Sequence, residues 1–292
     1  MVDLVKFAEE NNIAIGACSP EPLCEKRLRA SPFVPFVKKD LKKRVDPAAV
    51  LPGVRSIIAI GVGSRMPLIS AFEGEIGAKA GYAELSSLGT DCDYHPIVKE
   101  VLAELSWILE KSFGSDFKAK ALVDSPTLDE RAFAHRAGLG FYGKNGLIIC
   151  PKFGTRFNIG LLLTNFRLED LRYRETQTFE SCPPSCGLCI KACPNGALQE
   201  GQPLDAALCV SYLTQKKVLE PSEESLMGNQ LYGCDICQDI CPFNPPREKT
   251  YVNPQELAAW TDGEINDRFS HTSMLWQGTG ILRRNGRLYC SI

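Results

Sequence analysis

The sequence lacks any apolar run long enough to cross a membrane. Its richest stretches, Ser56–Gly63 and Phe157–Phe166, have the length of a strand, whereas a membrane helix needs ~20 apolar residues. The N-terminal residues, which include Asp3, Glu9 and Glu10, lack the apolar core of a signal peptide and are typical of a short amphipathic helix. These absences predict a cytoplasmic protein without a membrane partner.

An excess of charge of one sign is also missing. The 292 residues include 33 Lys and Arg and 35 Asp and Glu, which gives a formal net charge of −2. This balance excludes a uniformly basic nucleic-acid-binding surface, although the local clusters Lys38–Arg44 and Arg283–Arg287 remain available for phosphate contacts. The glycine-rich signatures of dinucleotide-binding and P-loop folds are absent, so the sequence gives no support for a nucleotide cofactor.

Cysteine, in contrast, is abundant. Eight of the 13 cysteines lie within residues 182–241, where the pattern C-x2-C-x3-C-P occurs twice, from Cys186 to Pro194 and from Cys234 to Pro242. In a reducing compartment, clustered cysteines bind metal more often than they form disulfides. The other five are scattered, and we expect ordinary buried thiols at Cys18, Cys24, Cys92, Cys150 and Cys290.

The repeated cysteine pattern predicts two 4Fe–4S clusters. Soft thiolates match iron, and in bacterial two-cluster ferredoxins the last cysteine of a run binds the other cluster. Zinc is the alternative, since two C-x2-C pairs also form a zinc ribbon, but zinc does not account for the duplicated x3-C-P. Crossed ligation predicts one set of Cys182, Cys186, Cys189 and Cys241, and a second set of Cys193, Cys209, Cys234 and Cys237.

Expected strands and helices alternate in the first part of the chain. A helix is expected to follow His95 and to end at Gly114. A second is expected to begin with a capping box of Thr127 and Glu130 and to run through about Ala137, where Gly138 ends it. Strands are expected at 12–19, 56–63, 118–124, 147–150 and 157–164. The sequence therefore predicts an α+β protein: a mixed catalytic domain over 1–170, a bacterial ferredoxin-like double-cluster domain over 171–250 and a short helical tail over 251–292.

The sequence resembles the epoxyqueuosine reductase family, which is related to reductive dehalogenases. The stretch from Val123 to Gly146, VDSPTLDERAFAHRAGLGFYGKNG, looks like that family's signature, and Asp93-Tyr94-His95 heads a helix as it does there. Further matches follow in family order: RVDP from 44, LPGVRS from 51, CVSYLT from 209, GCDICQ from 233 and CPFN from 241. Long members carry a helical-repeat extension after the ferredoxin-like domain, so the resemblance predicts a short form without it.

The resemblance implies a chemistry and a substrate. Members of the family reduce epoxyqueuosine to queuosine at the wobble position of tRNA, with a cobalamin in the catalytic domain and two 4Fe–4S clusters. By this resemblance the clusters generate cob(I)alamin, and Asp124 protonates the departing epoxide oxygen. Such an acid needs a pKa raised by burial beside the corrin. We also expect an external low-potential electron donor and a monomeric chain.

Other residues of the matched motifs are expected at the cofactor or the substrate. Glycines permit close approach of a large planar ligand, and a lysine suits a phosphate or a corrinoid propionamide. Structural roles remain open for all of them, such as a turn at Asp124 or a helix start at His95. The expected cofactor-binding residues are Tyr94, His95, Arg131, Gly140, Gly143, Lys144 and Asn145.

Two other functions remain open. One is a corrinoid and iron–sulfur reductase of another small substrate, such as an organohalide or a different epoxide. The other is an electron-transfer protein that reduces the corrinoid of a partner. Corrinoid binding distinguishes both enzymes from a ferredoxin-type carrier, and loss of the Asp124 carboxyl distinguishes turnover from electron delivery.

Overall fold

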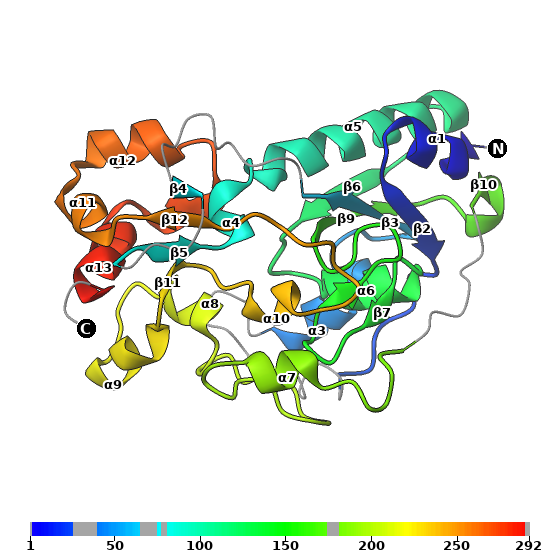
Figure 1. The fold of residues 1–292 in the computed structure, drawn as a ribbon. Helices are drawn as coiled ribbons and strands as arrows, with labels where there is room; N and C mark the ends of the chain where they lie inside the picture. The colour runs from blue at the N-terminus through cyan, green and yellow to red at the C-terminus, as the bar shows by residue number, and fades with distance from the viewer. Residues whose placement is uncertain (1, 26–39, 65–74, 77–80, 174–180, 290–292) are drawn as a thin grey trace. The chain divides into compact units, whose positions relative to one another are not determined.

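The computed structural model describes residues 2–25, 40–64, 75–76, 81–173 and 181–289. They form two compact units, each built from two separate segments of the chain (Figure 1). The first unit comprises Met1–Gly63 and His95–Cys186, and the second comprises Ser64–Tyr94 and Gly187–Ile292. Ser64–Tyr94 therefore belongs with the C-terminal half and not with the predicted catalytic domain over 1–170.

A four-stranded antiparallel sheet forms the centre of the first unit. The strands lie in the order β2, β3, β9, β6. Their bounds are Ala14–Cys18 for β2, Ser56–Gly63 for β3, Phe157–Thr164 for β9 and Ala119–Val123 for β6. The two central strands are almost entirely apolar because both of their faces are covered. Ser56 and Thr164 form a buried polar pair in this register. Their hydroxyl oxygens, Ser56 Oγ and Thr164 Oγ1, share a hydrogen bond of 2.8 Å across β3 and β9.

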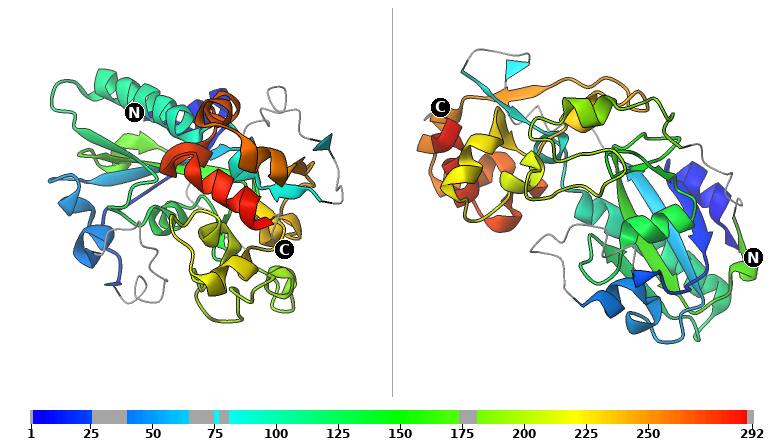
Figure 2. Two further views of the ribbon diagram at one scale, coloured as in Figure 1. Left: turned by 90° about the vertical axis from the view of Figure 1, so that its left-hand side faces the viewer. Right: turned by 90° about the horizontal axis from the view of Figure 1, so that it is seen from below.

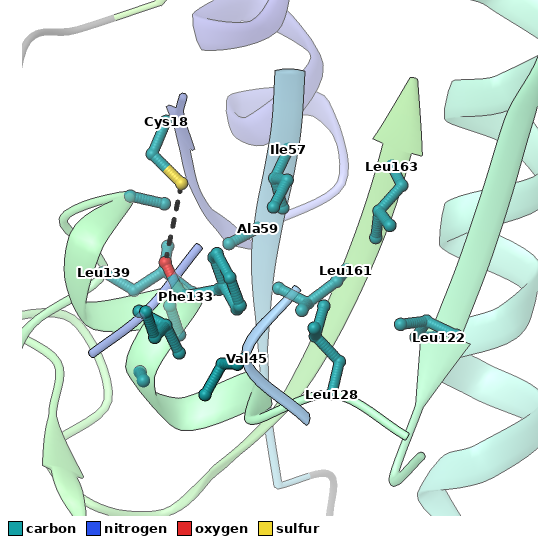
Figure 3. Packing of buried hydrophobic residues seen from close by; sticks show 14 residues of the cluster. Cys18, Val45, Ile57, Ala59, Leu122, Leu128, Phe133, Leu139, Leu161 and Leu163 are labelled. Atoms are coloured by element: carbon teal, nitrogen blue, oxygen red, sulfur yellow. Dashed lines mark hydrogen bonds between the residues drawn. The ribbon is translucent and has the colours of Figure 1, made fainter. Parts of the chain in front are cut away.

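Helices cover both faces of this sheet. On one face lies α5 (Tyr94–Phe113), whose Val98 and Leu102 pack so closely over Gly160 that a Cβ there would come within 2.6 Å of Val98 Cγ1. On the other face lies α6 (Glu130–Arg136), whose Phe133 is buried against the strands (Figure 3). The expected helix and strand pattern of this part is thus confirmed, with bounds shorter by one to three residues at several ends.

Shorter elements complete the first unit. The expected N-terminal helix is α1 (Leu4–Glu10), with Asp3 as its N-cap. The other elements are β1 (Val2–Asp3), α3 (Leu41–Val45), β7 (Phe141–Tyr142), β8 (Ile148–Ile149) and β10 (Leu171–Arg172). No helix among the described residues is both long and apolar enough to span a bilayer.

A second, mixed sheet organises the other unit. Its strand order is β11, β5, β12, β4, with β11 parallel to β5 and the other pairs antiparallel. The strands are β11 (Gln230–Tyr232), β5 (Ala83–Leu85), β12 (Thr250–Val252) and β4 (Glu75–Ile76). The short helices before the tail are α4 (Ser87–Thr90), α7 (Leu188–Ala192), α8 (Val210–Leu213), α9 (Pro221–Glu224) and α10 (Ile236–Asp239).

The predicted helical tail is part of the core of the second unit. It contains α11 (Pro254–Ala259), α12 (Asp262–Phe269) and α13 (Gly280–Tyr289). In Figure 2, α11 and α13 lie side by side, and at Gly286 a Cβ would come within 2.7 Å of the Pro254 carbonyl oxygen. Apolar side chains of the tail pack with those of β5, β11 and β12 in one buried cluster.

A buried group of charged residues connects β5 to the second cysteine run. Arg247 donates from Nη2 to Glu84 Oε1 and from Nε to Asp239 Oδ1, both at 2.9 Å, and Nη2 lies 3.3 Å from Asp235 Oδ2. Lys249 Nζ adds a contact of 3.0 Å to Glu84 Oε2. The side chains of Glu84 and Asp235 are only 6% and 3% exposed, so their charges depend on these partners.

We expect the substitution Arg247→Met to destabilise the second unit by ~3–5 kcal/mol, because it leaves buried carboxylates without their counter-charge. Denaturant unfolding followed by circular dichroism measures the effect. The matched control is Lys217→Met, at an exposed position of the same unit, which is expected to change stability by less than ~0.5 kcal/mol. Equal stability of the two variants would show that Arg247 does not hold this group together.

Candidate active site and cysteine clusters

The expected acid, Asp124, lies at the turn that follows β6. Among the described non-glycine residues, only Asn12 and Asp124 have a positive φ, which is 48° at Asp124. The Asp124 side chain is 70% exposed, and its Oδ2 lies 3.8 Å from Nε2 of His95 in the first turn of α5. The structure thus brings together two of the residues that the sequence singled out. The burial expected for this carboxyl is not provided by the residues that the structure describes.

Glu130 reaches back to this turn from the start of α6. Its carboxylate accepts the backbone N–H of Asp124 at 3.1 Å and that of Ser125 at 2.8 Å. Burial raises the pKa of Glu130 to about 8, against the lowering effect of the Ser125 N–H, and the negative charges of Asp124 and Asp129 add to the rise. The acid with a raised pKa in this site is therefore Glu130.

The prediction of a capping box between Thr127 and Glu130 at the start of α6 was wrong. Asp129 is the N-cap of α6 and accepts the N–H of Ala132 at 3.1 Å. The Thr127 hydroxyl instead bonds to Ser125 Oγ at 2.6 Å. A T-x-x-E pattern fits a capping box equally well, but here a closer aspartate caps the helix and the Glu130 carboxylate is directed to the preceding turn.

Packing accounts for two glycines of the signature. A Cβ at Gly140 would come within 2.1 Å of the Ile149 carbonyl oxygen, and one at Gly143 within 2.7 Å of Asn145 Oδ1. Both positions belong to the β7–β8 hairpin and its turn, where protein atoms occupy the space a side chain would need. A corrinoid contact at Gly140 or Gly143 stays a prediction.

Asn145 has a feature that suits a polar ligand. Its side chain is buried, and its Oδ1 accepts the N–H of Leu147 at 3.2 Å. Its Nδ2 has no hydrogen-bond partner among the described residues, although a buried amide donor normally has one. An acceptor such as a corrinoid amide oxygen would satisfy this group, so Asn145 fits the expected cofactor.

Lys144, Arg131 and Tyr94 complete the expected set. The Lys144 Nζ donates to the carbonyl oxygen of Pro184 at 3.0 Å, and Arg131 Nη1 donates to that of Gly146 at 3.2 Å. Both cations therefore brace loops of the first unit. Tyr94 is the first residue of α5. Cofactor contacts by these three residues stay predictions.

Four cysteines of the second unit influence one another. Burial raises the pKa of Cys234 to about 12, and the adjacent thiols of Cys209 and Cys193 raise it further. Burial also raises the pKa of Cys237, and Cys234, Cys209, Asp235 and Cys189 add to the shift. These influences include all four thiols of the second predicted set and also Cys189 of the first, and thiolate sulfur is the donor that an iron–sulfur cluster requires. The division of the thiols into two sets stays a prediction.

The two cysteine runs also repeat in three dimensions. The N–H of Cys193 bonds to the Ile190 carbonyl, and that of Cys241 bonds to the Gln238 carbonyl in the same way. After each Cys-Pro, the cysteine carbonyl accepts an N–H three residues later, and α7 packs against α10. The internal repeat is therefore structural as well as sequential.

The first predicted set is divided between the units. Cys182 and Cys186 belong to the first unit, and Cys189 and Cys241 to the second. Their joint ligation of one cluster stays a prediction. Over the described part of the chain, no three His, Cys, Asp or Glu side chains converge closely enough to hold a single metal ion.

The scattered cysteines are not all buried thiols. Cys18 is buried, its thiol donates to the Phe133 carbonyl at 3.9 Å (Figure 3), and burial raises its pKa to about 12. Cys150 is buried as well, whereas Cys92 is partly buried. The expectation was wrong for Cys24, which is exposed. Cys290 lies outside the described residues.

The predicted basic cluster of the tail has structural contacts. Arg284 donates to the carbonyl oxygens of Lys216 and Lys217, and burial lowers its pKa. Arg283 Nη1 donates to Asp262 Oδ1 at 2.6 Å. In the other cluster, Lys38 and Lys39 lie outside the described residues, and the basic residues that follow form α3.

Two stretches of the sequence match models of known protein families. Residues 44–125 match the family model described as Epoxyqueuosine reductase QueG, DUF1730, and residues 182–244 match a 4Fe-4S double cluster binding domain. The second match supports iron–sulfur clusters over zinc. The epoxyqueuosine reductase of Staphylococcus aureus is 32% identical over an alignment of 305 positions, which covers 98% of this chain and 78% of the relative.

Solved structures agree with these matches. A crystal structure of epoxyqueuosine reductase with an epoxyqueuosine-modified tRNA-Tyr stem loop has a TM-score of 0.84 and 29% identity, covering 99% of this chain and 80% of that one. A Bacillus subtilis epoxyqueuosine reductase whose catalytic aspartate loop is swung out of the active site has a TM-score of 0.83 and 30% identity, with the same coverage. The mixed fold with a double-cluster domain is thereby confirmed, and the chain belongs to the epoxyqueuosine reductase family.

Proposed function

We propose that this protein reduces epoxyqueuosine to queuosine in tRNA. The observation that carries the proposal is the position of Asp124 beside His95 at the end of β6, in a chain that resembles epoxyqueuosine reductases over both units. The relative solved with a modified tRNA stem loop supports tRNA as the substrate. The cytoplasm, where tRNA is modified, is the proposed compartment.

The reaction needs two electrons and two protons, and it releases one water as the epoxide becomes an alkene. A bound cobalamin would supply the reducing metal centre that opens the epoxide. Asp124 in its protonated form donates a proton to the departing oxygen, since its exposed carboxyl is accessible to a substrate. His95 Nε2, 3.8 Å away, is placed to orient this carboxyl and to return a proton to it.

Asn145 and the turn at Asp124 are the proposed contacts with the cofactor. The buried Nδ2 of Asn145 would donate to an amide oxygen of the corrinoid. A cofactor bound near this turn would exclude water from part of the exposed Asp124 side chain, which would favour the protonated carboxyl. In the Bacillus subtilis relative the catalytic aspartate loop is swung out, and we infer that the Asp124 turn can move in the same way.

The two cysteine sets would pass the electrons singly. The set of Cys193, Cys209, Cys234 and Cys237 is proposed to hold one 4Fe–4S cluster, and the set of Cys182, Cys186, Cys189 and Cys241 the other. A cluster exchanges one electron at a time, so two deliveries from an external low-potential donor complete each turnover. The chain is proposed to act as a monomer.

We expect queuosine to form only when cobalamin is present. Reconstituted protein is incubated anaerobically with a reductant and epoxyqueuosine-containing tRNA, with and without cobalamin, and the digested nucleosides are measured by mass spectrometry. Omission of the cofactor should reduce product to background, because the opening of the epoxide would depend on the cofactor, whereas the clusters would only deliver electrons. Absence of product from protein that holds both clusters and the corrinoid would contradict the proposed substrate.

A further inference from the structure

The backbone at Asp124 has a conformation that needs support. A φ of 48° is in the left-handed region, which costs energy for any residue other than glycine, although aspartate tolerates it better than most. Only a residue with surrounding contacts keeps this conformation. The contacts that maintain the turn therefore decide where the Asp124 carboxyl lies.

Glu130 provides two such contacts at once. Its Oε2 accepts the N–H of Asp124 at 3.1 Å, and its Oε1 accepts the N–H of Ser125 at 2.8 Å. Two successive N–H groups that point to one carboxylate require the chain to turn as it does here, because in an extended strand successive N–H groups point in opposite directions. Since Glu130 is the first residue of α6, whose Phe133 is in the core, the carboxylate is attached to a fixed element.

We propose that Glu130 is a positioning residue that holds the Asp124 turn in its left-handed conformation and thereby presents the Asp124 carboxyl to the substrate. This inference rests on the proposed function, because it assigns Asp124 as the acid. It extends that function, since it gives Glu130 a role through the backbone of the turn: both of its carboxylate oxygens accept backbone N–H groups.

The protonation state of Glu130 should change the strength of this contact. The ionised carboxylate accepts both N–H groups, whereas the protonated form has one oxygen that carries a hydrogen and accepts poorly. Burial raises the pKa of Glu130 to about 8. The hydrogen bonds from the Asp124 and Ser125 N–H groups should therefore become stronger as the pH rises through about 8, because the carboxylate ionises. Two carboxylates near the turn, those of Asp124 and Asp129, disfavour the ionised form of Glu130. His95 lies beside Asp124, and Arg44 lies close to both Asp129 and Arg131.

Hydrogen exchange tests the contact without turnover. Exchange of residues 121–128 is followed by mass spectrometry in the cluster-containing protein and in Glu130→Gln, which has the same size but only one acceptor oxygen. We expect exchange of the Asp124 and Ser125 amides to accelerate by about ten- to a hundredfold in the variant, because it loses charge-assisted hydrogen bonds. Protection at these amides should also increase from pH 7 to pH 9 in the original protein and remain constant in the variant.

Turnover supplies the second measurement. Glu130→Gln is expected to lower kcat by about ten- to a hundredfold, with an unchanged KM for the tRNA and unchanged iron content, because Asp124 spends less time in position. The pH dependence of kcat is expected to show an ionisation near pH 8 in the original protein and to lack it in the variant. The matched control is Glu104→Gln, an exposed position on α5, which should leave kcat and exchange unchanged.

Each outcome decides the proposal. Unchanged exchange at Asp124 and Ser125 in Glu130→Gln would overturn it, as would a loss of kcat accompanied by faster exchange throughout α6, which indicates a general structural role. If the original protein does not convert epoxyqueuosine, the proposed function fails, and the exchange measurement still shows whether Glu130 holds the turn.

Discussion

Replacement of Asp124 by asparagine should lower kcat for queuosine formation by about 10²–10⁴-fold, the range that a general acid contributes. Asparagine has nearly the same size and adopts a positive φ at least as readily, so the turn at 48° is preserved and only the proton is lost. The measurement is single-turnover formation of queuosine by protein with defined iron and corrinoid content. Loss of rate at unchanged cofactor content would identify the carboxyl as the missing group.

The control for this experiment is Asp116→Asn, an exposed position that precedes β6 in the same unit, which should react like the original protein. Equal rates for Asp124→Asn and this control would contradict the acid role. They would also favour the alternative in which the protein carries electrons to a partner, because a carrier has no need of the Asp124 proton.

The parts of the fold that could be predicted are those with a strong local pattern. The strands 56–63 and 157–164 have the predicted bounds because they are continuous apolar runs that lie in the centre of a sheet. The second sheet could not be predicted, since β5 and β11 have three residues each and pair across a long separation in sequence. Strands so short have no detectable period, so their pairing is decided by tertiary packing.

In the candidate site, too, some residues could be predicted from a local pattern and others only from the fold. The cysteine runs were readable because cluster ligands follow a fixed spacing, and Asp124 with His95 was expected from a resemblance. The role of Glu130 was missed because its T-x-x-E context also fits a capping box, and only the fold shows which amides its carboxylate accepts. One feature of the sequence indicates the charged group around Arg247. Asp235 and Asp239 are acidic residues inside a cysteine run, and buried carboxylates require a counter-charge.

The crossed arrangement of the cysteines leads to a second large effect. Cys189→Ala and Cys193→Ala are each expected to lower the iron content from about eight to about four atoms per chain, because each removes a ligand of a different 4Fe–4S cluster. Either variant should also lose most of its turnover, since electrons would pass through both clusters. Iron analysis and electron paramagnetic resonance of the reduced protein measure the result, and the exposed Cys24→Ala serves as the control.

Double variants separate crossed ligation from ligation within each run. If the sets are crossed, Cys193 and Cys209 bind the same cluster, so Cys193→Ala with Cys209→Ala should lose no more iron than either single variant. Cys189→Ala with Cys193→Ala should lose nearly all of it, although these two residues belong to one run. If the runs were not crossed, the second pair would leave one cluster intact.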